Sequence, residues 1–159
     1  MSKSEARVRA AIEALELDAN ILHMPASTRT AADAAEACAC DVAQIAKSMI
    51  FEGAESGALK LLIVSGAHQV DVARAPELFG EGLVRADAKR VRKETGFAIG
   101  GVAPLGHLNP IETWMEDHLL TYPLVWAAAG TPSAVFSITP DALHAATGAT
   151  LFSLDPAKG

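Results

Sequence analysis

The chain has 159 residues, half of them hydrophobic and one-fifth charged, and carries a formal net charge of −6. This composition is globular rather than disordered, and the length fits one domain over residues 1–159. The acidic balance argues against a surface that coats nucleic acid broadly, so we expect no DNA partner. No apolar run approaches the ~18 residues of a membrane helix, and Glu13 and Glu16 lie where a secretion signal needs an apolar core. We therefore expect a cytoplasmic protein with no membrane partner.

The hydrophobic pattern predicts both helices and strands along the chain. Val8, Ile12 and Leu15 recur at helical spacing, and Thr30 is a typical helix N-cap. The expected helices cover residues 3–17, 30–40, 42–46, 71–79 and 86–95, with a last one from 139 to a stop at 148. The expected strands cover residues 21–24, 47–51, 59–65, 97–99, 112–115, 124–128 and 134–138.

Two of these strands, 47–51 and 59–65, flank a turn over residues 53–57 and should form a hairpin. Other strands are separated from their neighbours by helices. The combination of hairpins and helix-separated strands predicts a mixed sheet, rather than a doubly wound parallel sheet.

A glycine-rich loop over residues 96–107 follows the most basic helix of the chain. Glycine lets a backbone approach a ligand closely, so such a loop can present N–H groups to a group that needs hydrogen bonds. Its glycines do not have the G-x-G-x-x-G spacing of a dinucleotide-binding turn, and no Gly-Lys-Ser/Thr follows as in a P-loop. Apart from His107 at its end, the loop has no side chain typical of catalysis. We expect it to act through its backbone.

The sequence shows no pattern typical of a metal site or a disulfide. Cys38 and Cys40 are the two cysteines, and positions two apart on a helix point in different directions. The five histidines lack the spacing of helical metal ligands. We expect neither a metal nor another cofactor.

Three segments together resemble the YbaK/prolyl-tRNA synthetase-associated editing domain family. Lys47 stands at the head of a strand, Gly100–Pro104 form a G-x-x-x-P loop, and Ala128-Ala129-Gly130 form a small-residue turn after another strand. The resemblance implies a single α+β domain with a mixed, largely antiparallel, curved sheet flanked by helices. It also implies hydrolysis of the ester of a mischarged tRNA, often tRNA-Pro, by a free-standing relative of the editing insertion in prolyl-tRNA synthetases.

The resemblance also places the site. Lys47 would supply a fixed positive charge, and the N–H groups of Gly100, Gly101 and Val102 would stabilise an oxyanion, where one donor can be worth ~3 kcal/mol of the barrier. The expected substrate contacts are Ala103, Pro104, His107, Ala128, Ala129 and Gly130. Ser48 beside Lys47 suggests a nucleophile pair, but neighbours on a strand face opposite sides, which disfavours that interpretation.

The implied partners are the tRNA acceptor end and prolyl-tRNA synthetase. Lys89, Arg90 and Lys93 lie on the basic helix and could contact acceptor-stem phosphates; the alternative is a solvated helix face. Residues 129–136 contain no Asp or Arg, unlike relatives that act on cysteinyl-tRNA, which favours a small, weakly polar aminoacyl group such as alanine, serine, threonine or a short unnatural one.

Two other functions remain open at this stage. One is a non-catalytic module that binds a tRNA end or a synthetase, and the other is a hydrolase or binder of another small acyl ester, which would not need the basic helix. Retention of Lys47 together with Gly100–Pro104 favours the enzyme. The attacking group, whether water, a ribose hydroxyl or a substrate side chain, is also left open.

Overall fold

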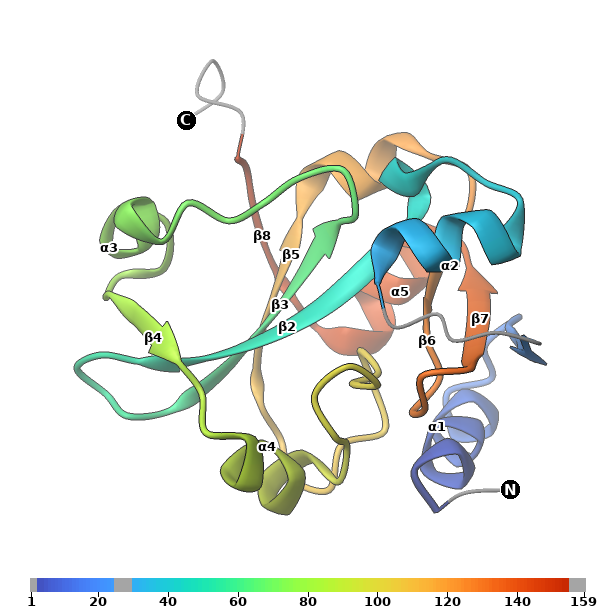
Figure 1. The fold of residues 1–159 in the computed structure, drawn as a ribbon, viewed down its shortest axis with the longest axis horizontal. Coiled ribbons are helices and arrows are strands. Elements are labelled where there is room, and N and C mark those ends of the chain that lie inside the picture. The colour runs from blue at the N-terminus through green and yellow to red at the C-terminus, as the bar shows by residue number, and fades with distance from the viewer. Residues whose placement is uncertain (1–2, 25–29, 155–159) are drawn as a thin grey trace.

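The computed structural model describes residues 3–24 and 30–154. Within these residues the strands form two sheets that lie side by side (Figure 1). The smaller sheet has the order β1-β7-β6 and contains β1 (Asn20–His23), β6 (Val125–Ala128) and β7 (Ala134–Ile138). The larger sheet has the order β4-β2-β3-β5-β8 and contains β2 (Ala46–Gly53), β3 (Leu59–Ser65), β4 (Leu83–Arg85), β5 (Glu112–Glu116) and β8 (Thr150–Phe152).

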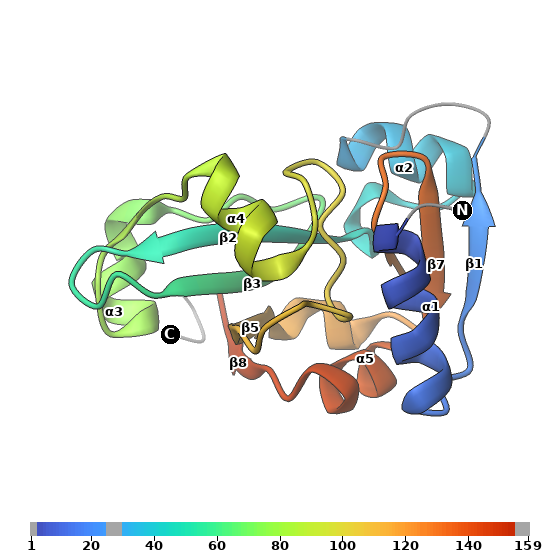
Figure 2. The same ribbon diagram turned by 90° about the horizontal axis from the view of Figure 1, so that it is seen from below.

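Strand pairing confirms the mixed, largely antiparallel character expected of the fold. The β2–β3 hairpin forms as predicted, β4 also pairs antiparallel with β2, and β5 pairs parallel with both β3 and β8. The smaller sheet is antiparallel throughout. An isolated bridge between Ile45 and Trp126 connects the two sheets just before β2 begins. Figure 2 shows the hairpin extending away from the smaller sheet, which lies at the other end of the molecule with the first helix.

Local sequence signals explain where the helices begin and end. The Thr30 side chain accepts a hydrogen bond from the Asp33 N–H at 3.1 Å, and Asp87 caps the basic helix in the same way through the Arg90 N–H. Gly96 ends that helix with φ 85°. The helices are α1 (Lys3–Ala14), α2 (Ala31–Cys38), α3 (Ala75–Phe79), α4 (Ala88–Thr95) and α5 (Pro140–Thr147), with 3₁₀ turns at Val42–Gln44, Val72–Arg74 and Asp117–Thr121. No helix in the described part of the chain has the length and apolarity needed to cross a membrane.

Some expected elements differ from the structure. Residues 97–99 are not a strand, because the chain turns at Ala98–Gly101 and the Phe97 N–H bonds to the Thr95 hydroxyl instead of a neighbouring strand. The expected helix 42–46 is a single 3₁₀ turn, since β2 already begins at Ala46. The expected helix 71–79 is a 3₁₀ turn followed by the short α3. The three-residue strands β4 and β8 were not expected.

The glycine-rich loop is anchored in the main core. Phe97, Val102, Ala103 and Leu105 are buried, and they pack with residues of α1, β3, β6 and β7 in one hydrophobic cluster. A second cluster on the other face of the larger sheet contains Leu62, Val64, Phe79 and Phe152, among others. Burial of Phe97 and of the continuous stretch from Gly101 to Leu105 therefore gives the loop a defined place between α4 and β6 (Figures 1 and 2).

Candidate functional site

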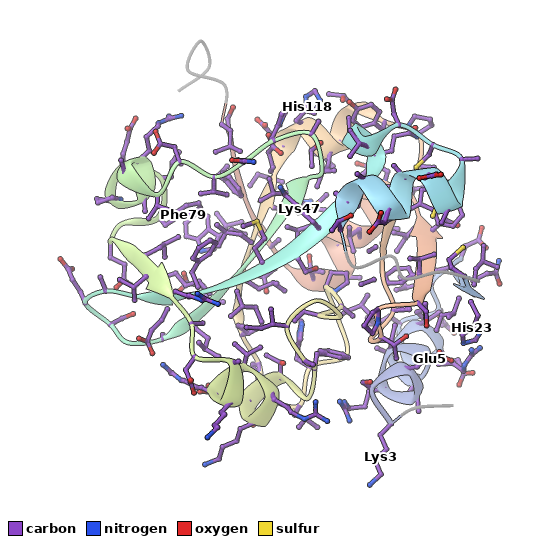
Figure 3. All side chains as sticks on the ribbon, in the orientation of Figure 1. Lys3, Glu5, His23, Lys47, Phe79 and His118 are labelled. Atoms are coloured by element: carbon purple, nitrogen blue, oxygen red, sulfur yellow. The ribbon has the colours of Figure 1, made fainter. Side chains whose placement is uncertain are left out.

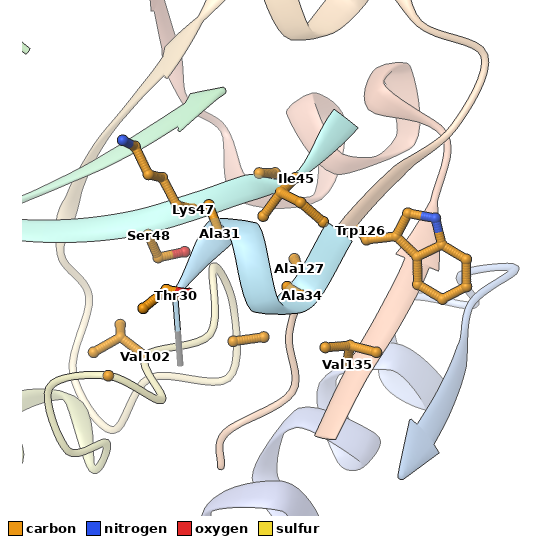
Figure 4. Close-up of a pocket in the computed structure, with 13 residues that line it drawn as sticks. Thr30, Ala31, Ala34, Ile45, Lys47, Ser48, Val102, Trp126, Ala127 and Val135 are labelled. Carbon is orange, nitrogen blue, oxygen red and sulfur yellow. The ribbon is translucent and has the colours of Figure 1, made fainter. Parts of the chain in front are cut away.

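A small cavity lies where α2, the start of β2, the glycine-rich loop and the smaller sheet meet (Figure 4). Its volume is about 90 Å³. This is less than the ~150 Å³ of an apolar cavity that takes up benzene, so the space suits a side chain of only a few atoms. The lining residues are mostly small and apolar: Thr30, Ala31, Ala34, Ile45, Ala46, Lys47, Ser48, Gly100, Val102, Trp126, Ala127, Ala128 and Val135.

Two of the three proposed oxyanion donors line this cavity. Gly100 and Val102 do so, and their N–H groups donate no hydrogen bond to any residue that the structure describes. The Gly101 N–H, in contrast, donates to the Ala98 carbonyl at 3.0 Å and closes a turn in which Gly100 has φ 97°. That positive φ is what the third residue of a type II turn requires, which accounts for glycine at position 100. The expectation for Gly101 as a donor therefore has to be corrected, because its hydrogen is already used.

The small-residue turn contacts the loop directly. A Cβ added at Gly101 would lie 3.2 Å from Thr131 backbone atoms, so the two motifs touch. Ala128 lines the cavity, whereas Ala129 is fully buried in the core and donates to the Ala134 carbonyl at 2.9 Å. Gly130 has φ 100°, and a Cβ there would lie 2.9 Å from the Ser4 backbone in α1. Within this motif, only Ala128 lines the cavity.

The remaining loop residues that were expected to contact the substrate pack behind the cavity instead of lining it. Ala103 and Pro104 are buried, and neither lines the cavity. The His107 Nε2 lies 2.8 Å from the Ala103 carbonyl and so carries the hydrogen, while the His107 ring packs edge-on against Phe97 at 5.6 Å. Burial lowers the pKa of the His107 imidazole, and the hydrogen bond to Ala103 only partly opposes that effect. These three residues fix the shape of the loop in the structure.

Helix α1 holds the beginning of the loop, a feature that sequence reasoning missed. The Arg7 guanidinium donates a hydrogen bond to the Gly96 carbonyl and lies 5.3 Å from the centre of the Phe97 ring. A cation over an aromatic face is attractive. No local pattern signals this contact, because Arg7 and Gly96 are 89 positions apart.

Lys47 and Ser48 are neighbours on β2 that face opposite ways. Figure 4 shows the Ser48 hydroxyl turned toward Thr30 and the Lys47 ammonium turned away from it. The Lys47 Nζ donates to the His68 carbonyl at 2.5 Å, and the buried Ser48 Oγ has no hydrogen-bond partner among the described residues. Burial lowers the pKa of Lys47, and the negative charge of Glu116 partly opposes that change.

The basic helix α4 offers fewer free cations than its sequence suggests. Lys89 and Lys93 are exposed. Arg90, in contrast, forms ion pairs with Glu52 and Glu94. Arg90 is therefore occupied by structural contacts, and Lys89 and Lys93 remain as candidate phosphate ligands.

Several lining residues lay outside the expected site. Ala31 and Ala34 come from α2, three positions apart on one helix face, and Val135 comes from β7. The N-cap at Thr30 and the helical spacing of the alanines were visible in the sequence, but which face meets the cavity depends on tertiary packing. No three His, Cys, Asp or Glu side chains of the described residues converge into a group that could hold a metal ion.

Comparisons with known proteins agree with this architecture. A family model of the aminoacyl-tRNA editing domain matches residues 25–146. A crystal structure described as that of a candidate trans-editing enzyme for prolyl tRNA synthetase is 44% identical, with a TM-score of 0.87 over 98% of this chain and 99% of that chain. The crystal structure of hypothetical protein APE2540 is 28% identical, with a TM-score of 0.83 over 91% of this chain and 96% of that chain.

A curated relative is the uncharacterized protein YwhH of Bacillus subtilis (strain 168), which is 27% identical over 124 residues, or 78% of each chain. The family model, by comparison, spans well over half of the present chain and includes Lys47, the glycine-rich loop and the small-residue turn. The chain therefore belongs to the aminoacyl-tRNA editing domain family.

Proposed function

We propose that this protein is a trans-acting aminoacyl-tRNA deacylase that removes a small amino acid from a mischarged tRNA, with tRNA-Pro as the first candidate. One observation carries the proposal: the backbone N–H groups of Gly100 and Val102, which donate to no residue that the structure describes, belong to residues that border a small apolar cavity of about 90 Å³. The cavity suits a short side chain, and the N–H groups suit the ester carbonyl next to it. Family membership and the similarity to a candidate prolyl-tRNA trans-editing enzyme support the same substrate class.

The chemistry needs no strong nucleophile from the protein, because an aminoacyl ester is already activated. Overall, water is consumed: a new bond forms to the ester carbon, the bond to the ribose oxygen breaks, and that oxygen leaves with a proton. Charge develops on the carbonyl oxygen during this step, and each oriented N–H donor can lower the barrier by ~3 kcal/mol. With Gly101 already engaged by Ala98, the donors in this proposal are Gly100 and Val102.

Lys47 supplies the positive charge of the proposed site. Lys47 is one of the residues that line the cavity, and its ammonium lies on the far side of β2 at the His68 carbonyl. A lysine side chain has four rotatable bonds, so the ammonium can reach a phosphate or ribose oxygen of the tRNA end without moving the strand. Exposed Lys89 and Lys93 on α4 would add salt-sensitive contacts to the acceptor stem.

The test is a deacylation screen with tRNA-Pro charged with alanine, serine, threonine, 2-aminobutyrate, cysteine or proline. We expect hydrolysis of one or more of the small aminoacyl esters and at least about 100-fold loss in Lys47→Ala. Lys3→Ala is the matched control, because Lys3 is an exposed lysine at the start of α1, far from Lys47 (Figure 3). Binding of these tRNAs without any hydrolysis would instead favour a non-catalytic module.

The role of α4 has its own test. Reversing Lys89 and Lys93 to Glu should weaken tRNA binding and flatten its dependence on salt, because each lost phosphate contact removes about one unit of salt slope. Arg90→Ala should affect the stability of the fold more than tRNA binding, since its partners are Glu52 and Glu94. Unchanged affinity after the double reversal would exclude α4 from the interface.

A further inference from the structure

A buried carboxylate lies on the opposite face of the larger sheet from the cavity. Glu116 ends β5 and is 1% exposed. Its Oε1 accepts the Ser65 N–H at 3.0 Å, and its Oε2 lies 2.6 Å from the His68 Nδ1. Burying an ionised carboxylate is costly unless partners compensate for lost water, so such a group calls for an explanation beyond packing.

Strand register places Glu116 on the same face as Lys47. Lys47 is opposite Val64 in the antiparallel β2–β3 pair, and Ile63 is opposite Met115 in the parallel β3–β5 pair. Glu116 therefore falls beside Val64, and the three side chains share one face. Val64, which lies between Lys47 and Glu116 on this face, is fully buried.

His68 connects the two charged residues. Its carbonyl accepts the hydrogen bond from the Lys47 Nζ at 2.5 Å, while its ring is held by Glu116. Its own N–H donates to the Ser65 carbonyl at 3.0 Å, so the segment from Ser65 to His68 is tied at the backbone and at the side chain. Since Ser65 also donates to Glu116, one carboxylate restrains both ends of this segment.

A second imidazole packs against this arrangement. The rings of His68 and His118 are 4.8 Å apart, and His118 Nε2 lies 3.0 Å from the Tyr122 hydroxyl. Figure 3 places His118 and Lys47 in the same part of the molecule. Glu116 acts on the Lys47 ammonium by its charge, and Lys47 also contacts the His68 carbonyl. The other titratable groups of the elements packed at His68 are Asp117 and His118, which border the same hollow as the His68 ring, and Tyr122, which contacts His118.

We propose that Glu116 and His68 are positioning residues that fix the Lys47 ammonium on the face of β2 opposite the cavity. Glu116 acts through the His68 ring and backbone, which set the place of the carbonyl that Lys47 contacts, and through its own negative charge. The proposal rests on the proposed function only in giving the ammonium a role toward the tRNA end. The positioning itself is a property of the folded chain.

The negative charge of Glu116 should change the pKa of Lys47 in a definite direction. Burial lowers the pKa of Lys47, and the Glu116 carboxylate opposes this change. Removing the carboxylate charge should lower the pKa of Lys47 further, so the ammonium would lose its proton at a lower pH. If the charged ammonium serves the reaction, the alkaline limb of the pH–rate profile should move in the same direction.

The first test is the titration of Lys47 in Glu116→Gln, which keeps the shape of the side chain and an acceptor for the Ser65 N–H. Following ¹³C-labelled lysine side chains by NMR, we expect the pKa of Lys47 to fall by about half a unit or more. Glu112→Gln is the matched control: Glu112 lies on the same strand and face, and it pairs with the Lys60 Nζ at 2.5 Å. It should leave the pKa of Lys47 unchanged.

A second variant covers the case in which Glu116→Gln does not fold. His68→Ala keeps the backbone carbonyl but removes the ring held by Glu116, so it should also change the pKa of Lys47. In His68→Asn, the pKa of Lys47 should return part of the way to its wild-type value. Wild-type titration of Lys47 in folded Glu116→Gln or in His68→Ala would overturn the proposal.

Kinetics distinguish positioning from a general loss of stability. Misplacing a catalytic group by about 1 Å can cost up to ~100-fold, so we expect kcat in Glu116→Gln to fall about 10-fold or more while KM changes little. An equal loss in Glu112→Gln would indicate a structural effect and contradict the assignment. If the wild-type protein hydrolyses no mischarged tRNA, the proposed function fails, but the titration of Lys47 still decides whether Glu116 positions it.

Discussion

The two faces of β2 do different chemistry although they are built from consecutive residues. On one face, Ser48 borders a small cavity lined mostly by small apolar residues, with Gly100 and Val102 of the glycine-rich loop among them. On the other face, Lys47 joins a charged network with His68 and Glu116. The difference shows how the two-residue period of a strand places an apolar cavity and a charged network on opposite faces of consecutive residues. The following predictions test this division of roles.

The largest effect should come from filling the cavity. Ala128→Leu adds three carbon atoms to a wall of a space of about 90 Å³, so the aminoacyl side chain would no longer fit. We expect kcat/KM for the best mischarged tRNA to fall at least ~100-fold, with little loss of stability because the side chain enters existing space. Ala67→Leu, an exposed position near His68 on the charged side, is the control. Equal activity of Ala128→Leu and the wild type would mean that the amino acid binds elsewhere.

The next largest effect should be on stability, at the small-residue turn after β6. Gly130→Ala should reduce the free energy of unfolding by about 2 kcal/mol, because the residue has φ 100° and its Cβ would meet the Ser4 backbone at 2.9 Å. Gly57→Ala has a positive φ but no atom within 4 Å, so it measures backbone strain alone. Urea unfolding of both variants gives the comparison. If Gly130→Ala loses no more than Gly57→Ala, α1 does not support this turn as tightly as the structure indicates.

A smaller, pH-dependent effect should come from His107. Burial lowers its pKa in the folded state below the ordinary value of 6.5. The unfolded chain therefore binds this proton more readily, so the contribution of His107 to stability is present above about pH 6.5 and is lost as the pH falls through the folded-state pKa. His107→Gln keeps a donor for Ala103 without titrating. The difference in unfolding free energy between wild type and variant should shrink on acidification, and a difference that is independent of pH would contradict the assignment.

The smallest effect on stability should be that of Ser48→Ala. The Ser48 Oγ is buried with no partner in the described residues, so its removal breaks no hydrogen bond and should leave stability unchanged or raise it by up to ~1 kcal/mol. If the hydroxyl meets the bound substrate, KM should rise while the folded protein is as stable as before. A loss of stability greater than that of a typical surface change would mean that the hydroxyl is already bonded in the free protein.

Much of the fold was predictable because its signals are local. The β2–β3 hairpin, the N-cap at Thr30 and the stop of α4 at Gly96 each depend on residues a few positions apart. The three-residue strands β4 and β8 are too short to show a period, and they exist because longer strands provide partners for them. Residues 97–99 have apolar character because Phe97 is a core residue of the loop, not because they pair in a sheet.

The sequence by itself determined the parts of the site that depend on local geometry. These are the glycine-rich loop that follows α4, the small-residue turn after β6 and a lysine at the head of β2. The strand period also indicated that Ser48 and Lys47 face opposite sides. Tertiary structure decided the rest, since it requires contacts between residues far apart in the chain. The hydrogen bond from Arg7 to Gly96 and the link from Glu116 through His68 to Lys47 depend on such contacts, because each joins residues from different packed elements.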